Sequence, residues 1–167
     1  MAAARVLRWV GPILVSAALI ALPPSAVASP GAAVRGGGVV SGPLGTTSQL
    51  GFTATTSGGA FLCVMAGRSG GFPFGPWQSV QQMHVQGRVT PGSLSVTAGV
   101  ATFSGTATIH VIGKTSSGIF ATTLYDVPFT STQAAGGAGV AWHLLDVPGV
   151  GAFGPATLKT GQITIWP

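Results

Sequence analysis

Apolar and polar residues alternate with a period of two along most of the chain after residue 39. This period is typical of a strand with one buried face. In residues 82–89, the apolar face carries Met83, Val85 and Val89, and the polar face carries Gln82, His84, Gln86 and Arg88. In residues 100–112, one face carries Ala101, Phe103, Ala107, Ile109 and Val111, and the other carries Thr102, Ser104, Thr106, Thr108 and His110. These two segments predict two-faced strands.

Glycine and proline mark the turns between such segments. Ala98-Gly99 predicts a tight hairpin, because glycine accepts the positive φ of primed turns. Gly105 predicts a bulge or a close backbone approach, and Pro128 predicts an edge or a bend in residues 119–132. Because strands and turns alternate without helical segments, residues 39–167 predict a single antiparallel β-sandwich of about 8–10 short strands, with a closed β-barrel as the alternative.

The N-terminal residues have the three parts of a signal peptide. Arg5 and Arg8 precede an apolar run over 9–22, and Ala26-Val27-Ala28 supplies a small-residue cleavage site. The run is shorter than the about 20 apolar residues that a membrane span needs. We therefore expect a signal peptide over 1–28, a flexible Gly/Ala/Pro-rich lead over 29–38, no stable membrane span after cleavage, and a location outside the cell or in the cell envelope.

Charged residues are few and scattered after the signal peptide. The cations occur singly, at Arg35, Arg68, Arg88, Lys114 and Lys159. Nucleic-acid binding needs cations clustered along successive phosphates, so we expect no nucleic-acid partner. Low charge leaves strand edges poorly protected, and we expect that an edge strand can mediate self-association.

The chain is poor in groups for catalysis. Asp126 and Asp146 both precede Val-Pro, which favours a turn-forming role over a pair of glycosidase carboxylates. Ser69 lies in a Gly-x-Ser-x-Gly pattern. A nucleophile elbow requires a helix directly after the serine, and the sequence predicts none there. Cys63 is the single cysteine and lies in an apolar run, which predicts core packing. We predict no enzyme activity, no catalytic residue and no cofactor.

The three histidines leave one possibility open. His84 and His110 lie on the polar faces of their strands and could bind a metal if the strands pair in the right register, whereas His143 lies in a different strand. Neither His84 nor His110 lies in a closely spaced metal-ligand motif. We expect a solvated imidazole at each position and assign no metal site.

Three aromatic residues gather in one Gly/Pro-rich loop. Phe72, Phe74 and Trp77 on such a loop predict a surface for a ligand or partner. The alternative is that the rings fold back and cover the open end of the β-structure.

Four short segments carry a resemblance to a known family: Phe61-Leu62-Cys63, Gly87-Arg88-Val89-Thr90, Phe103-Ser104-Gly105-Thr106-Ala107 and Gly161-Gln162-Ile163-Thr164-Ile165. Their order resembles the post-COAP-1 type of module, a small β-rich domain of exported bacterial proteins. The resemblance implies an exported β-sandwich and no activity. Such modules often carry acidic turns, but residues 133–139 contain no acid, so no Ca²⁺ site is expected there.

Four functions are open. The first is an exported non-catalytic protein with a structural, adhesive or binding role and an unknown extracellular or envelope partner. The second is a binder of small apolar ligands, with a barrel cavity lined by Phe52, Phe61, Met83 and Phe103. The others are a membrane-inserting β-barrel and an enzyme that uses Ser69, Cys63 or a histidine.

Overall fold

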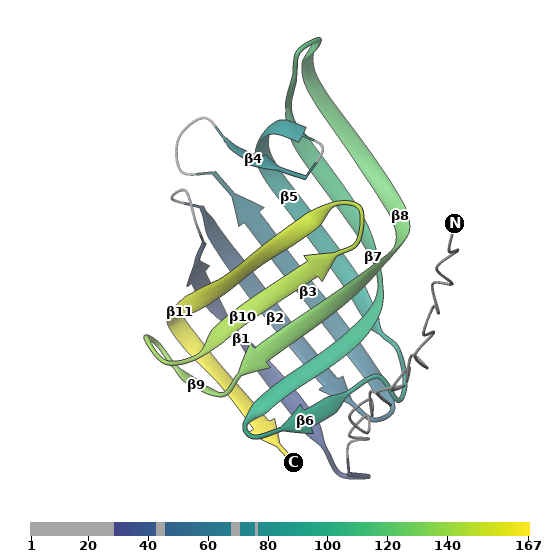
Figure 1. Cartoon of the computed structure of the whole chain (residues 1–167), viewed down its shortest axis with the longest axis vertical. Coiled ribbons are helices and arrows are strands. Elements are labelled where there is room, and N and C mark those ends of the chain that lie inside the picture. The colour runs from purple at the N-terminus through teal and green to yellow at the C-terminus, as the bar shows by residue number, and fades with distance from the viewer. Residues whose placement is uncertain (1–28, 43–45, 68–70, 76) are drawn as a thin grey trace, which may run out of the picture.

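The computed structural model describes residues 29–42, 46–67, 71–75 and 77–167 (Figure 1). The predicted signal peptide over 1–28 lies outside these residues. Strands make up nearly all of the described chain: β1 (Ala33–Ser41), β2 (Thr47–Thr55), β3 (Gly58–Ala66), β4 (Phe72–Phe74), β5 (Trp77–Val89), β6 (Ser95–Thr97), β7 (Val100–Thr115), β8 (Gly118–Ala134), β9 (Gly136–Gly137), β10 (Trp142–Val147) and β11 (Gly151–Trp166).

The sheet closes into a barrel of eight antiparallel strands, in the order β5-β3-β2-β1-β11-β10-β8-β7. Closure comes from β5, which pairs with β3 along one edge and with β7 along the other. The closed barrel that we gave as the alternative is confirmed, and the expected sandwich is not found. The reason is that the strands form one continuous sheet, and β5 pairs with β7 at its other end, so no break divides it into two.

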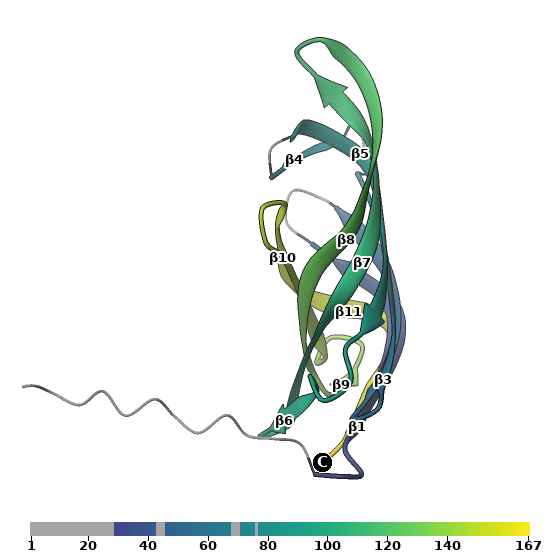
Figure 2. The same cartoon turned by 90° about the vertical axis from the view of Figure 1, so that its right-hand side faces the viewer.

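The barrel is flattened, with β1, β2, β3 and β5 on one side and β10 with the start of β11 on the other (Figures 1 and 2). The short strands β4, β6 and β9 extend the sheet beside β5, β7 and β11. The turn between β7 and β8 projects at the end of the barrel opposite the C-terminus (Figure 2). Within the described ranges, no helix has the length and apolar character needed to cross a membrane.

The predicted two-faced strands are confirmed in β5 and β7. Met83, Val85, Phe103 and Ile109 are buried in the barrel interior, while the alternate residues of both strands lie on the outer face. The predicted hairpin is confirmed as well, because Ala98 and Gly99 have φ values of 49° and 77° and join β6 to β7. Positive φ at both central residues is what a type I′ turn requires.

The first strand corrects the flexible lead that we expected over 29–38. β1 begins at Ala33 and pairs with both β2 and β11. Its glycines belong to the barrel wall: a Cβ on Gly36 would lie 2.9 Å from the Phe52 ring and 2.8 Å from Ile163. Because these glycines have no side chains, the core side chains can approach the β1 backbone. In the sequence, the same glycine-rich composition shows no period of two and therefore predicted a loop.

The long strand β8 contains a bulge at Tyr125 and Asp126. Ile109 of β7 pairs with Leu124 and Ala107 pairs with Val127, so two residues of β8 lie opposite one residue of β7. Asp126 has a φ of 53°, a backbone conformation that residues other than glycine adopt uncommonly. We expected Asp126 at a strand-end turn, and it lies instead within a strand.

Pro128 follows the bulge, where β8 has β7 on one side only. The pairing of β10 with β8 runs from Thr130 to Ala134 and does not reach Pro128. Because proline cannot donate a ladder hydrogen bond, it is tolerated at such an edge. The prediction of an edge or bend at Pro128 is therefore confirmed.

Candidate functional site

The barrel interior is filled by a cluster of aromatic rings. The centroids of Phe61 and Phe129 are 5.1 Å apart, and those of Phe52 and Phe103 are 5.8 Å apart. Such distances are those of packed aromatic pairs. Three of the four residues that we expected to line an apolar cavity belong to this cluster, and the fourth, Met83, is fully buried. These side chains pack as a core.

Beside the ring cluster lies a small buried polar group formed by Ser131, Gln133 and His143. Gln133 donates from Nε2 to Ser131 Oγ at 2.7 Å, and His143 stacks on Phe61 with 5.8 Å between ring centroids. Among the described residues, neither ring nitrogen of His143 has a hydrogen-bond partner, and neither has Oε1 of Gln133. Burial lowers the pKa of His143 to about 4, because desolvation disfavours the imidazolium. His143 is therefore a neutral core residue and not the solvated imidazole that we expected.

Cys63 is completely buried, as its apolar context predicts. Burial raises the pKa of its thiol to about 12, and the nearby Ser48 hydroxyl lowers it to a smaller extent. Within the part of the chain that the structure describes, the Ser48 hydroxyl does not reach hydrogen-bonding geometry with any partner. Since the thiolate is the reactive form, this thiol is unsuited to nucleophilic chemistry.

The aromatic loop packs partly onto the end of the barrel. Phe74 and Trp77 are half-buried against the core, and Trp77 stacks on Phe120 with 6.3 Å between ring centroids. Phe72 pairs with Val80 through its backbone, and its side chain lies outside what the structure describes. Only part of the Phe74 and Trp77 rings is thus open to a partner, and the predicted surface of Phe72, Phe74 and Trp77 stays a prediction.

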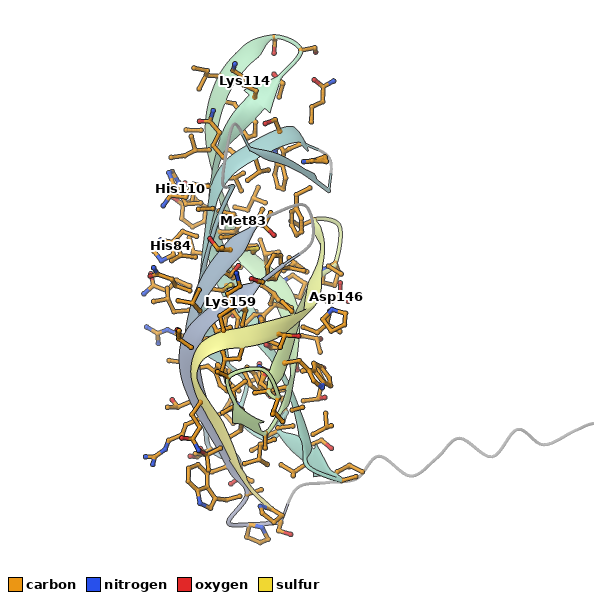
Figure 3. All side chains as sticks on the ribbon, turned by 90° about the vertical axis from the view of Figure 1, so that its left-hand side faces the viewer. Met83, His84, His110, Lys114, Asp146 and Lys159 are labelled. Atoms are coloured by element: carbon orange, nitrogen blue, oxygen red, sulfur yellow. The ribbon has the colours of Figure 1, made fainter. Side chains whose placement is uncertain are left out.

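Asp126 and Asp146, the remaining candidates for catalysis that the structure describes, do not come together with the histidines or Cys63. Ser69 lies outside the described residues, which omit 68–70. Asp146 is exposed near the end of β10, on the opposite side of the barrel from His84 (Figure 3). Asp126 lies on the outer face at the β8 bulge.

A depression on the outside of the barrel brings polar side chains together. It has a volume of about 780 Å³ and crosses β3, β5, β7 and β8; we call it the outer groove. Its polar side chains are Ser57, Gln86, Arg88, Thr106, Thr108 and Asp126. Sequence patterns place four of them on the outer faces of β5 and β7, but they do not show that these strands are neighbours.

The β8 bulge completes the outer groove. The extra residue turns both Tyr125 and Asp126 outward, opposite Thr108, and Tyr125 is 72% exposed. Bulges commonly re-aim side chains beside functional sites. Within the part of the chain that the structure describes, neither Arg88 nor Asp126 is held in a salt bridge. Both charges are therefore free to meet a ligand.

Next to the outer groove, the structure pairs His84 with His110. The two residues are direct partners in the antiparallel ladder between β5 and β7, one outward row from the partners Gln86 and Thr108. The register that the sequence left open therefore places two imidazoles side by side on one face. Among the described residues, no group of three or more His, Cys, Asp or Glu side chains gathers as a metal site.

A second, smaller depression of about 400 Å³ lies over β1, β2 and β11. Its one cation, Arg35, is already engaged, because the guanidinium lies 5.0 Å from the centroid of the Trp166 ring. This cation–π contact occupies the group that a ligand would use. The second depression is thus a weaker candidate than the outer groove.

No protein-family model, curated protein or solved structure matches this chain. The resemblance to the post-COAP-1 type of module accordingly stays a prediction.

Proposed function

We propose that the protein is an exported, non-catalytic binding protein whose ligand lies in the outer groove. One observation carries the proposal: aromatic rings fill the barrel interior, whereas polar and charged side chains line a depression of about 780 Å³ on the outside. Ligand sites are concave and offer a few convergent polar groups. The outer groove meets that description, and the packed part of the interior does not.

The lining favours a polyhydroxylated ligand, such as a segment of an envelope or extracellular polysaccharide. Arg88 donates hydrogen bonds, Asp126 accepts them, and the Gln86 amide and threonine hydroxyls do both. A sugar hydroxyl also donates and accepts, so it matches such a mixed set. Polar groups predominate in the lining, which disfavours a purely apolar ligand in this groove.

The positions of the two aspartates support the absence of glycosidase activity. A glycosidase of the common kind holds two carboxylates on either side of one glycosidic bond. Asp126 lies in the outer groove, whereas Asp146 lies on the neighbouring strand β10 opposite Thr130, four residues farther along β8 and about 13 Å away at the rise of a strand. With no glutamate in the chain, a bound polysaccharide would meet a single carboxylate.

The test is an NMR titration of the mature protein with soluble oligosaccharide fragments of bacterial envelope polysaccharides. Amide shifts should change around Gln86, Arg88 and Thr108, and Arg88→Ala should weaken binding about tenfold or more, since a hydrogen bond to a charged group contributes about 1.5–3 kcal/mol. Gln49→Ala, on the outer face of β2 and outside the groove, is the matched control. Shift changes elsewhere, or unchanged binding by Arg88→Ala, would contradict the proposal.

Binding of a small apolar ligand inside the barrel is the second candidate. Eight-stranded barrels are wide enough to hold one small ligand, and the partnerless atoms of His143 and Gln133 offer it polar contacts. A native mass spectrum of the protein from culture supernatant separates the two candidates. A retained lipid or small molecule would favour the interior site, and a bare mass that begins at Ser29 would favour the outer groove and confirm cleavage.

We also propose that the exposed edge of β8 can mediate self-association. Between Gly118 and Phe129, the ladder pairs β8 with β7 alone. An unpaired edge is a template for another strand, although the bulge and Pro128 shorten the usable part. Sedimentation should show a concentration-dependent dimer that Thr122→Pro abolishes; a monomer at all concentrations would contradict it.

A further inference from the structure

His84 and His110 form a cross-strand pair on an open part of the barrel surface. Their Cα atoms are partners in the β5–β7 ladder, and both side chains lie on the outer side of the barrel (Figure 3). Directly opposite residues of an antiparallel pair have Cβ atoms about 4.5–5.5 Å apart. Two imidazoles at that separation can reach a common point above the sheet.

The local contacts leave ligand nitrogens available. His110 is exposed, and its Nδ1 makes a hydrogen bond of 2.9 Å with Thr123 Oγ1 of β8. This contact orients the ring and leaves Nε2 without a partner in the described structure. His84 is half-buried, and no described hydrogen bond engages its ring. A hydrogen bond to the second ring nitrogen is the usual support of a metal-binding histidine.

The neighbouring residues of β5 and β7 place no charged side chain beside the two imidazoles. The neighbouring outward positions are Gln82 with Ile112 on one side and Gln86 with Thr108 on the other. The nearest cations along the strands, Arg88 and Lys114, are four residues away, about 13 Å at the rise of a strand. An approaching ion therefore meets two imidazoles with no other charged side chain beside them along these strands.

We propose that His84 and His110 form a binding site for one divalent transition-metal ion, with water in the remaining coordination positions. Imidazole suits Cu²⁺, Ni²⁺ and Zn²⁺, and Cu²⁺ binds most tightly in the usual order of affinities. Ca²⁺ and Mg²⁺ need several oxygen ligands, which this pair does not supply. The site is independent of the proposed ligand of the outer groove.

Few other side chains of the described structure compete with this pair for a transition metal. The third histidine, His143, is buried, as is the one cysteine. The mature sequence has two aspartates and no glutamate. The folded protein therefore presents a transition metal with few competing ligands.

The experiment is a Cu²⁺ titration of the untagged mature protein, followed by calorimetry and by electron paramagnetic resonance. We expect one ion per chain with hyperfine coupling to two imidazole nitrogens. His84→Gln and His110→Gln should each weaken binding at least about tenfold, because the second imidazole binds as an intramolecular ligand. Gln82→Ala, one outward row away and outside the outer groove, should bind as the wild type does.

Three results would overturn the proposal: coupling to a single nitrogen, two ions bound independently, or equal affinity in the wild type and the double His84→Gln/His110→Gln variant. Circular dichroism of each variant separates lost binding from lost folding, and all three positions lie on the outer face. Zn²⁺ in place of Cu²⁺ should give the same order of variants at lower affinity.

Discussion

The same side chain has opposite properties on the two faces of the barrel wall. His143 is sealed inside, stacked on Phe61, with a pKa lowered to about 4. His84 and His110 lie outside, where water and ions reach them. In a strand, one step along the chain moves a residue from one environment to the other. The contacts open to a polar residue of this barrel therefore depend on which face of the wall it occupies.

Neighbouring residues of β3 provide the largest expected difference between the two faces. Phe61 is buried in the ring cluster, whereas Leu62 is 41% exposed on the outer face. Phe61→Ala should lower the free energy of unfolding by about 3–5 kcal/mol, because it removes a large buried ring and leaves a cavity. Urea denaturation measures this loss, and Leu62→Ala is the control, with a change below about 1 kcal/mol. Equal losses would show that the ring cluster is not the core.

Acid should lower the stability of the fold through the interior histidine. The folded protein holds His143 below its ordinary pKa of 6.5, so the unfolded chain binds the extra proton between about pH 6.5 and 4. The contribution of neutral His143 to the free energy of unfolding is therefore fully present above pH 6.5. It is lost as the pH falls toward 4, by roughly 3 kcal/mol in all.

Denaturation curves at several pH values test this loss. His143→Phe should remove its contribution to the pH dependence, because the variant has no imidazole to protonate in the core. Leu62→Ala, a substitution on the outer face that removes no titratable group, is the control and should keep the wild-type profile. A His143→Phe profile as steep as that of the wild type would assign the acid sensitivity to another group.

Two strand glycines differ in the space beside them. A Cβ on Gly87 would lie 2.6 Å from the Phe129 ring, whereas a Cβ on Gly51 would have no atom within 4 Å apart from those of its chain neighbours. Gly87→Ala should cost about 1–3 kcal/mol, because overpacking displaces the ring. Gly51→Ala should change stability by at most about 0.5 kcal/mol. Thermal unfolding of both variants distinguishes these outcomes, and a tolerated Gly87→Ala would mean that the ring cluster is loosely packed.

The smallest effect is expected at the projecting turn. Ile119 is 77% exposed beside the turn between β7 and β8. Ile119→Thr keeps a branched side chain and should change the unfolding free energy by less than about 0.5 kcal/mol. A larger loss in chemical denaturation would show that a second chain covers Ile119 in solution.

Local sequence patterns predicted the strands but not the way in which they close. Alternation in β5 and β7 identified the inward and outward residues, and Ala98-Gly99 identified a hairpin. Closure depends on the pairing of β5 with β7, and no local pattern contains that contact. The glycines of β1 also concealed a strand, because glycine has no side chain to alternate.

The candidate sites were harder to predict for the same reason. His84 and His110 were both noticed, but a shared site required their register, which is set by contacts between distant segments. Asp126 was assigned to a turn, and its place in the outer groove follows from a one-residue bulge. A bulge of this kind has no reliable signature in a single sequence, since its partner strand defines it.

The bulge at Asp126 shifts the inward–outward alternation of side chains along β8 by one residue. Before it, the even-numbered residues Phe120 and Leu124 face inward; after it, the odd-numbered residues Phe129 and Ser131 do. A single period of two therefore assigns half of the strand to the wrong side. In an alignment, the inward positions of the two halves of β8 therefore have to be assigned separately. Deletion of one residue at the bulge would give the strand a single alternation, and every remaining side chain would keep its inward or outward direction.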